Sequence, residues 1–596
     1  MANELYSVTS HSISNLLGWI DSGSIAIPEI QRPFVWNSTQ VRDLLDSLYR
    51  GFPVGYIITW QNPNVRLKDG NIANGQRILI DGQQRVTALM TSLRGIQVID
   101  KDYTKRRIRI AFNPIEERFE VTNPAIERDS SWIADVSEVL KPGAQIFSMM
   151  NTYLAANPDV DQNQVTGSIQ RLKDMDVKQV GVIQLAEHLD IETVNEIFIR
   201  VNSKGVSLSQ ADFVMSKIAA SEQHGGHQLR KAIDYFSRLS RYPEFLDTIQ
   251  RDSDFKPEFL SKMRWLANYS DDIYQPDYTD MLRVAFTSEF GRGRLQDLVA
   301  LLSGRDFEIK QNFESIAEAS FAQLEAGVLR FMNETHFKRF VMIIRSAGFI
   351  TPKLLNSGNA LNFAYVVYLK GRADGMEQHQ LERLVTRWYA MSVLTGRYSG
   401  SAETAFDRDI RLLTERGLER GVQQAVSAAL GENFWEVALP EALNTSRSTT
   451  TGFLAYQAAQ ARANDYGFLS QSIRVPDLLV NRTDIHHIYP ADFLKRQGLP
   501  SRKYNQVANY VLAQQEINIR IGNKDPQVYF SELREQVRGG EVKYGGITDE
   551  QQLRDNLAVH CIPANMLDDS GMPYEDFLEQ RRYLMAQKVK AWFESL

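Results

Sequence analysis

The chain has 596 residues, of which 43% are apolar and 23% charged, and its formal net charge is −6. It contains no run of about 18 apolar residues and no N-terminal signal-peptide pattern, so we expect a cytoplasmic protein without membrane contact. The single cysteine, Cys561, excludes an intramolecular disulfide and a cysteine-cluster zinc site. The acidic balance excludes a globally basic nucleic-acid binder but not a local basic surface.

The first 235 residues alternate short strand-like runs with helical ones. Strands are predicted at 55–60, 77–82, 107–112 and 180–185, because these runs are rich in β-branched residues and are bounded by Gly, Pro, Asn or charged residues. This alternation is typical of an α/β or α+β domain.

Three polar segments of this region carry residues suited to an anion. They are IPEIQRPFVWN (27–37), DGQQRVT (81–87) and EIFIRVNSKGVSLSQADF (196–213). The second follows an apolar strand and precedes a helical run, and such a turn directs backbone N–H groups and a helix N-terminus at one point. The residues singled out in the three segments are Gln31, Arg32, Asp81, Gly82, Gln83, Gln84, Arg85, Thr87, Asn202 and Gly205.

These segments have structural alternatives that the sequence leaves open. Arg85 can bind a phosphate with two hydrogen bonds, and Asp81 can bind a metal or orient a water. A tight turn closed by an Asp81–Arg85 ion pair explains the same residues. In the third segment, Asn202 and Gly205 also suit the end of a helix, and Ser209 suits the start of the next.

From about 236 to 470 the pattern is mostly helical. The run 381–396 has apolar residues at spacings of three and four, and Gly396 predicts the end of a helix there. Trp265, Trp388 and Trp435 are expected in the core. The remaining region, 471–596, mixes strand-like, loop and helical pieces and closes with a predicted helix over 577–593.

The strongest chemical signal is DIHHIYP, residues 484–490, followed by Asn505, Asn509 and Asn518. Phosphodiester hydrolysis needs an activated water and a cation that stabilises charge on the phosphoryl oxygens. A neutral imidazole is a good base near pH 7, and a second imidazole with an amide oxygen can hold one divalent ion. Residues 481–530 carry seven basic and four acidic residues. The alternative is a pair of structural histidines with ordinary loop asparagines.

The order His-His, Asn, Asn resembles an HNH nuclease, a ββα-metal fold. By this resemblance His486 is a metal ligand, His487 the general base, Asn509 the residue that pins the loop, and Asn518 the second, helix-borne ligand. Mg²⁺ is the expected ion and Mn²⁺ the alternative. The family often has Asp at the first position, so His486 leaves the choice of metal open.

The three N-terminal segments together resemble the ParB/sulfiredoxin-like NTPase domain of GmrSD-type restriction systems, over roughly residues 10–220. By this resemblance the residues singled out in the three segments are the candidate nucleotide-binding residues. The combined resemblance implies an α+β multidomain protein with a ParB/sulfiredoxin-like domain at 1–235, a helical connecting region at 236–470 and an HNH domain at 471–596. It implies a modification-dependent (type IV) restriction enzyme that hydrolyses GTP, ATP or UTP and cuts or nicks double-stranded phage DNA carrying modified bases.

Two other functions fit the same residues. The protein can instead be a nickase that senses phosphorothioate in the DNA backbone, or a nucleotide-responsive regulatory DNA-binding protein whose nuclease half is degenerate. A homodimer would make double-strand cutting natural, although nothing in the sequence requires one.

Overall fold

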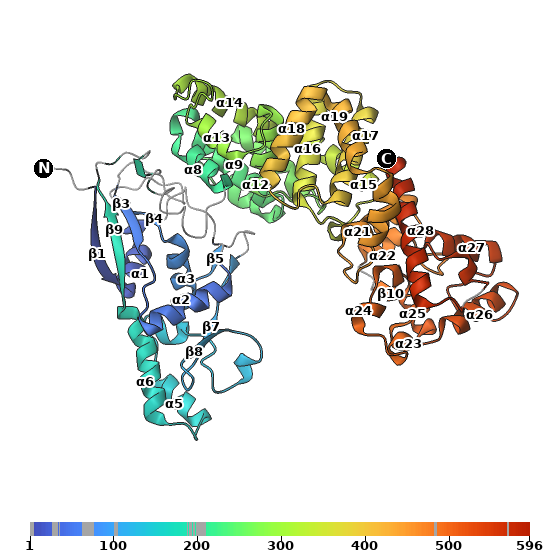
Figure 1. Ribbon diagram of the computed structural model, residues 1–596. Coiled ribbons are helices and arrows are strands. Elements are labelled where there is room, and N and C mark those ends of the chain that lie inside the picture. Colours follow the sequence, from blue (N-terminus) through green and yellow to red (C-terminus); the bar gives the residue numbers. More distant parts are fainter. Residues whose placement is uncertain are drawn as a thin grey trace. The chain divides into compact units, whose positions relative to one another are not determined.

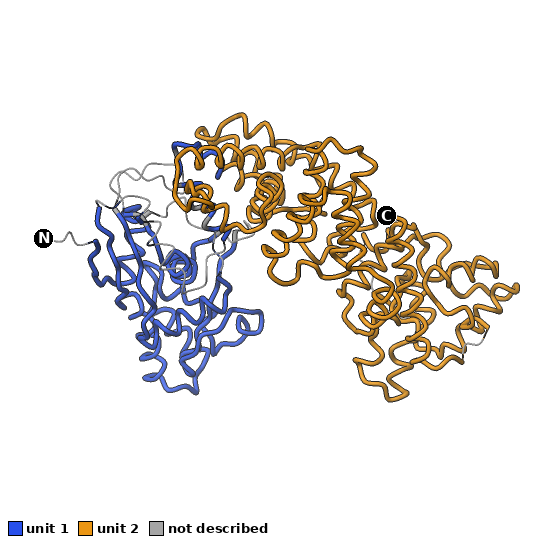
Figure 2. The backbone as a smooth tube through the Cα atoms, turned by 45° about the horizontal axis from the view of Figure 1, so that its top comes forward, with its two compact units in different colours: residues 1–230 blue, residues 231–596 orange. Residues whose placement is uncertain are grey.

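The computed structural model describes residues 5–26, 34, 36–61, 77–99, 105–187, 189, 193–194, 197, 210–481, 485–568 and 571–596. The chain divides into two compact units, residues 1–230 and residues 231–596 (Figure 2). No helix in the described part of the chain is long and apolar enough to cross a membrane.

The first unit contains a mixed five-stranded sheet with strand order β1-β9-β3-β4-β2. Strand β1 pairs antiparallel with β9, β9 parallel with β3, β3 antiparallel with β4, and β4 parallel with β2. The strands are β1 (Tyr6–Ser12), β2 (Ile25–Ala26), β3 (Ile57–Gln61), β4 (Arg77–Asp81) and β9 (Gln179–Leu185). The strands predicted at 55–60, 77–82 and 180–185 are therefore confirmed as β3, β4 and β9.

Apolar residues on both faces of this sheet build two cores. Ile57 and Leu79 belong to a large core with helices α1 (Ile13–Asp21), α2 (Ser38–Arg50) and α3 (Gln83–Leu93), which Figure 1 shows beside the sheet. The next residues along the two strands, Ile58 and Ile80, belong to a second cluster. Successive side chains of a strand point to opposite faces, so the continuous apolar runs fill both cores.

The strand predicted at 107–112 is shorter than expected. Only Ile110–Asn113 (β7) is extended in a ladder, and it pairs with β8 (Arg118–Val121) in a separate two-stranded sheet. The partner strand is four residues long, so the pairing reaches no further back than Ile110. Arg107, which precedes it, forms an ion pair with Asp135 at 2.5 Å. A further two-stranded sheet joins β5 (Val98–Ile99) to β6 (Lys105–Arg106).

The described residues 210–481 form helices and no named strand, as the sequence predicted. The predicted helix at 381–396 is part of α17 (Gln378–Thr395), and Gly396 adopts the left-handed conformation (φ 59°) that ends it. Trp265, Trp388 and Trp435 are buried. The longer helices are α8 (Gln210–Ala220), α9 (Gly226–Leu239), α12 (Tyr278–Phe290), α13 (Leu295–Leu302), α14 (Glu314–Phe331), α15 (Glu334–Ser346), α16 (Gly358–Ala373), α18 (Ala402–Arg416), α19 (Leu418–Ala429) and α21 (Thr451–Ala463).

The last part of the second unit contains a two-stranded antiparallel sheet followed by a helix. The strands are β10 (Ile485–His487) and β11 (Tyr510–Leu512), and the helix is α25 (Gln515–Ile521). The predicted C-terminal helix is α28 (Tyr574–Glu594). Its Trp592 donates a hydrogen bond to the Ala347 carbonyl at 2.9 Å, so α28 packs on the middle helices. Helices α26 (Pro526–Val537) and α27 (Glu550–Val559) complete this part.

Candidate functional site

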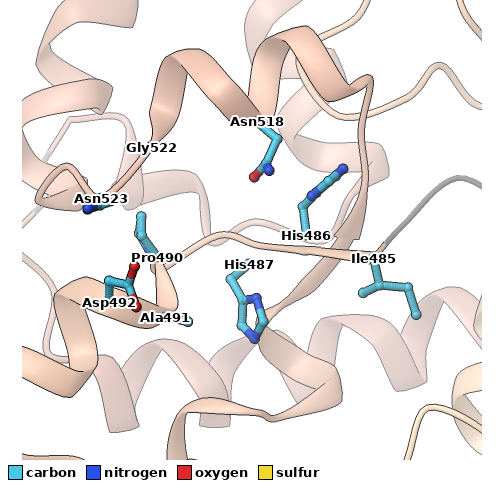
Figure 3. A pocket seen from close by; sticks show the side chains of 9 residues that line it. All are labelled: Ile485, His486, His487, Pro490, Ala491, Asp492, Asn518, Gly522 and Asn523. Carbon is cyan, nitrogen blue, oxygen red and sulfur yellow. The ribbon is translucent and has the colours of Figure 1, made fainter. Parts of the chain in front are cut away.

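Strand β10 presents the two adjacent histidines on opposite sides. His486 pairs with Val511 and His487 with Tyr510 in the antiparallel register. Figure 3 shows the His486 ring on the same side of the strand as Asn518 and the His487 ring on the other side. Both rings nevertheless line one hollow of about 480 Å³, because the strand ends at His487 and the chain turns before Pro490. The lining is completed by Ile485, Ala491, Asp492, Gly522 and Asn523.

His487 is held by a side chain that our sequence reasoning did not assign to the site. Its Nε2 lies 2.9 Å from the Asn505 Oδ1, and the Asn505 amide nitrogen donates to Ser501 Oγ at 3.0 Å. An amide oxygen only accepts, so Nε2 carries the proton and Nδ1 keeps the lone pair. The ring also packs edge-on against Tyr510, with centroids 5.2 Å apart.

The surroundings of His487 favour its neutral form. Burial lowers the pKa of the imidazole, the hydrogen bond that Nε2 donates to Asn505 raises it, and the nearby charge of Lys495 lowers it further. The side chain is therefore uncharged at neutral pH and has a nitrogen available to accept a proton.

Asn509 holds the chain that follows β10. Its Oδ1 accepts a hydrogen bond from the Tyr489 amide at 2.8 Å, and its Nδ2 donates to the Tyr489 carbonyl at 3.0 Å and to the Tyr504 carbonyl at 3.2 Å. The side chain is fully buried. Asn509 thus fixes the turn after the two histidines by bonding both backbone polar groups of Tyr489.

Arg581, on α28, anchors the floor of this region. It is fully buried and donates to the carbonyls of Ala508 (2.7 Å), Tyr510 (2.9 Å) and His560 (3.2 Å). Three backbone acceptors replace water around one guanidinium, so the position of β11 depends on this side chain.

Two side chains at the hollow suit a divalent ion. His486 offers an imidazole nitrogen from β10, and Asn518 offers an amide oxygen from α25. Among the described residues, none forms a hydrogen bond with the Asn518 side-chain amide, so this group is available to a ligand. The part of the chain that the structure describes holds no cluster of three or more His, Cys, Asp or Glu that could bind a metal. An ion here would keep several waters, as Mg²⁺ does in proteins.

The predicted strand–turn–helix unit of the N-terminal region is present. Strand β4 ends at Asp81, Gly82 adopts φ 95°, and α3 begins at Gln83. A side chain at Gly82 would be strained by this φ and would crowd Ile57, whose Cγ1 lies 3.0 Å from the Cβ position. Glycine therefore allows the tight passage from strand to helix.

Arg85 and Asp81 form the ion pair that the sequence allowed. The Arg85 Nη2 lies 3.0 Å from Asp81 Oδ2, and its Nη1 donates to the Val54 carbonyl at 3.0 Å. Gln83 and Gln84 are buried, and Thr87 is half-buried. The other predicted nucleotide-binding residues, Gln31, Arg32, Asn202 and Gly205, lie outside the described residues.

Sequence reasoning missed Asp492 and Asn523 as residues of the hollow, the contact of Asn505 with His487, and the support by Arg581. Asn505 stands four residues before Asn509, and this repeated Asn spacing was the available signal. Arg581 gave no signal, because an arginine in a long amphipathic helix usually faces solvent.

Comparisons with known proteins relate both the N-terminal region and the whole chain to other sequences. Residues 13–219 match the family described as the GmrSD restriction endonuclease, N-terminal domain, which agrees with the resemblance expected over residues 10–220. The chain is also similar to the uncharacterized protein MJ0686 of Methanocaldococcus jannaschii, with 19% identity over 638 aligned positions that cover 97% of this chain and 99% of that protein. The family match supports a relation to GmrSD-type restriction endonucleases, which are nucleases of defence systems.

Proposed function

We propose that this protein is a nucleotide-regulated DNA endonuclease or nickase that acts on modified foreign DNA in bacterial defence. In this proposal residues 1–235 bind nucleotide and recognise the modified DNA, residues 236–470 link the two ends of the chain, and residues 471–596 cleave the DNA. The observation that carries the proposal is the hollow at β10, where His487, His486 and Asn518 meet, in a chain whose residues 13–219 match a restriction endonuclease domain.

The residues of the hollow divide the work of phosphodiester hydrolysis. His487 accepts a proton at Nδ1 from the attacking water, since its Nε2 proton is engaged by Asn505. His486 and Asn518 would hold Mg²⁺ or Mn²⁺, which when bound supplies positive charge for the phosphoryl and leaving oxygens. Asn509 keeps the turn behind the histidines fixed, so that the reacting groups keep their spacing.

The nucleotide-dependent part of the proposal is supported by the family match and by the strand–turn–helix unit at Asp81–Arg85. An incoming phosphate would compete with Asp81 for the Arg85 guanidinium, because both anions favour the same planar donor. Exchange of this ion pair gives nucleotide binding a way to release Asp81. GTP, ATP and UTP remain the candidate nucleotides.

The test uses four DNA substrates with the full chain. Phage DNA with glucosylated hydroxymethylcytosine, phosphorothioate DNA, unmodified linear DNA and unmodified supercoiled plasmid are incubated with Mg²⁺, with and without nucleotide. The variant His487→Ala is compared with His379→Ala, which changes an exposed histidine of α17. We expect nucleotide-dependent cutting of base-modified DNA that His487→Ala and EDTA abolish and His379→Ala retains.

Each other result has a defined meaning. Cutting that depends on phosphorothioate assigns the sensing to the DNA backbone rather than to the base. Cutting that ignores both modification and nucleotide contradicts the proposed regulation. Absence of cutting, combined with a defence phenotype that survives His487→Ala, identifies a regulatory DNA-binding protein.

A further inference from the structure

A second hollow of about 480 Å³ lies between helices α15, α16 and α17, within the helical part of the second unit. These three helices lie next to one another in Figure 1. The hollow shares no lining residue with the one at β10. Its volume falls in the range of about 300–1,000 Å³ that is usual for small-molecule sites.

Two ion pairs shape the walls of this hollow. The Arg339 Nε lies 3.2 Å from Glu382 Oε1 and ties α15 to α17, and the Lys338 Nζ lies 2.7 Å from Glu334 Oε1 within α15. These pairs balance two of the three cations that line the hollow. The third, Arg372, forms no hydrogen bond or ion pair with any residue in the described ranges.

The floor of the hollow contains two further polar groups without a partner. Tyr368 is only 3% exposed, and its hydroxyl forms no hydrogen bond within the described part of the chain. The Nδ1 of His336 is likewise buried and has no hydrogen-bond partner there. Buried polar atoms are normally paired, so the unpaired Nδ1 of His336, beside the Tyr368 hydroxyl and the exposed Arg372 guanidinium, indicates a place for a ligand.

The three groups line the same hollow, and the ring centroids of His336 and Tyr368 lie 6.0 Å apart. Burial lowers the pKa of His336, the backbone of Arg330 acts in the opposite direction, and the positive charge of Arg372 lowers this pKa further. Burial raises the pKa of Tyr368, while the charges of Arg372 and Arg339 act in the opposite direction. The charge of the Arg372 guanidinium therefore lowers the pKa of both His336 and Tyr368.

We propose that this hollow binds a phosphate monoester. Its anionic oxygens accept hydrogen bonds from Arg372 and from the Tyr368 hydroxyl, which are both donors. The third contact is with the neutral His336, whose Nδ1 needs a proton from the ligand. A phosphate monoester has such a proton in its monoanion, which is the main form below its second pKa of about 6, whereas a phosphodiester or sulfate has no such proton.

The site is independent of the proposed nuclease function. A DNA backbone consists of phosphodiesters, so the hollow is suited to a small phosphorylated molecule and not to the backbone of DNA. Such a ligand would contact α15 and α16, and its binding would stabilise their packing.

Isothermal titration calorimetry of the full chain tests the proposal. The probes are inorganic phosphate and ribose 5-phosphate, compared with sulfate and with a short DNA duplex that has hydroxyl ends. The variants are Arg372→Ala and Tyr368→Phe, with Arg383→Ala as the control, since Arg383 is exposed on α17 and does not line the hollow. His487→Ala is included to separate this site from the one at β10.

We expect the two monoester-type probes to bind more tightly than sulfate or the duplex. Arg372→Ala should weaken their binding about tenfold or more and Tyr368→Phe several-fold, whereas Arg383→Ala and His487→Ala should leave it unchanged. Binding that survives Arg372→Ala, no binding of either phosphate probe, or equal binding of sulfate and the duplex would each overturn the proposal. Circular dichroism of each variant shows whether a loss reflects the contact or the fold.

Discussion

The hydrogen bond between Asn505 and His487 provides a sharp test of the candidate site. The substitution Asn505→Ala removes the acceptor that lies 2.9 Å from Nε2 and leaves His486, Asn518 and the backbone turn in place. If His487 is the general base, its imidazole becomes positively charged during the reaction. The bond to Asn505 then changes from a neutral to a charge-assisted one, so its loss affects the transition state more than the resting protein.

The size of the effect follows from that change. A neutral hydrogen bond contributes about 1 kcal/mol and one to a charged group about 2 kcal/mol, so the difference is about 1 kcal/mol. Loss of the acceptor also removes the preference for the tautomer with its lone pair on Nδ1. We expect kcat to fall about tenfold, with a nearly unchanged KM.

The assay is steady-state cutting of the substrate that the wild-type chain prefers. Asn505→Asp keeps an acceptor oxygen and should retain more activity than Asn505→Ala. Ser501→Ala removes only the 3.0 Å hydrogen bond that supports Asn505, so its effect should be smaller than that of either substitution. A wild-type kcat in Asn505→Ala, with an unchanged melting temperature, would refute the assignment of His487 as a base oriented through Nε2.

Three further predictions concern stability and are checked by thermal unfolding of the full chain. Arg581→Met should destabilise the second unit by about 3–5 kcal/mol, because it removes the donor to three backbone carbonyls. Arg581→Lys should recover part of this loss. A change below about 1 kcal/mol in Arg581→Met would contradict the anchoring role. Burial raises the pKa of Asp280 to about 6, so its ionisation opposes folding: the stability it contributes below its unfolded pKa is lost as pH rises to about 6. Asp280→Asn should therefore flatten this pH dependence, and an unchanged loss of stability up to about pH 6 would contradict the role of Asp280. Gly348→Ala should strongly destabilise the folded chain, since φ is 102° and the new Cβ would lie 2.0 Å from the Ala458 carbonyl oxygen. A melting temperature equal to that of the wild type would contradict this close approach of Gly348 to α21.

The local signals in the sequence predicted most of the secondary structure. Strands β3, β4 and β9 follow from short β-branched runs, and the end of α17 follows from Gly396, because a left-handed residue is cheapest as glycine. The turn at Gly82 between a strand and a helix follows from the same rule. The boundary of β7 did not follow, since it depends on the length of a partner strand that the local sequence does not specify.

Part of the candidate site was also indicated by the sequence. Residue types indicated a base and a metal ligand at His486 and His487, and the resemblance to HNH nucleases assigned roles to Asn509 and Asn518. Tertiary structure alone decided that Asn505 reaches Nε2 of His487.

Partners brought together from distant parts of the chain were beyond the sequence. Arg581 lies more than 70 residues from Ala508, yet folding places its guanidinium under β11. Arg372, Tyr368 and His336 form a second hollow only because α15 and α16 pack side by side. Sequence periodicity fixes which face of a helix is apolar, whereas the identity of the neighbour that this face meets is set by packing of the whole unit, and that packing decides which polar groups converge.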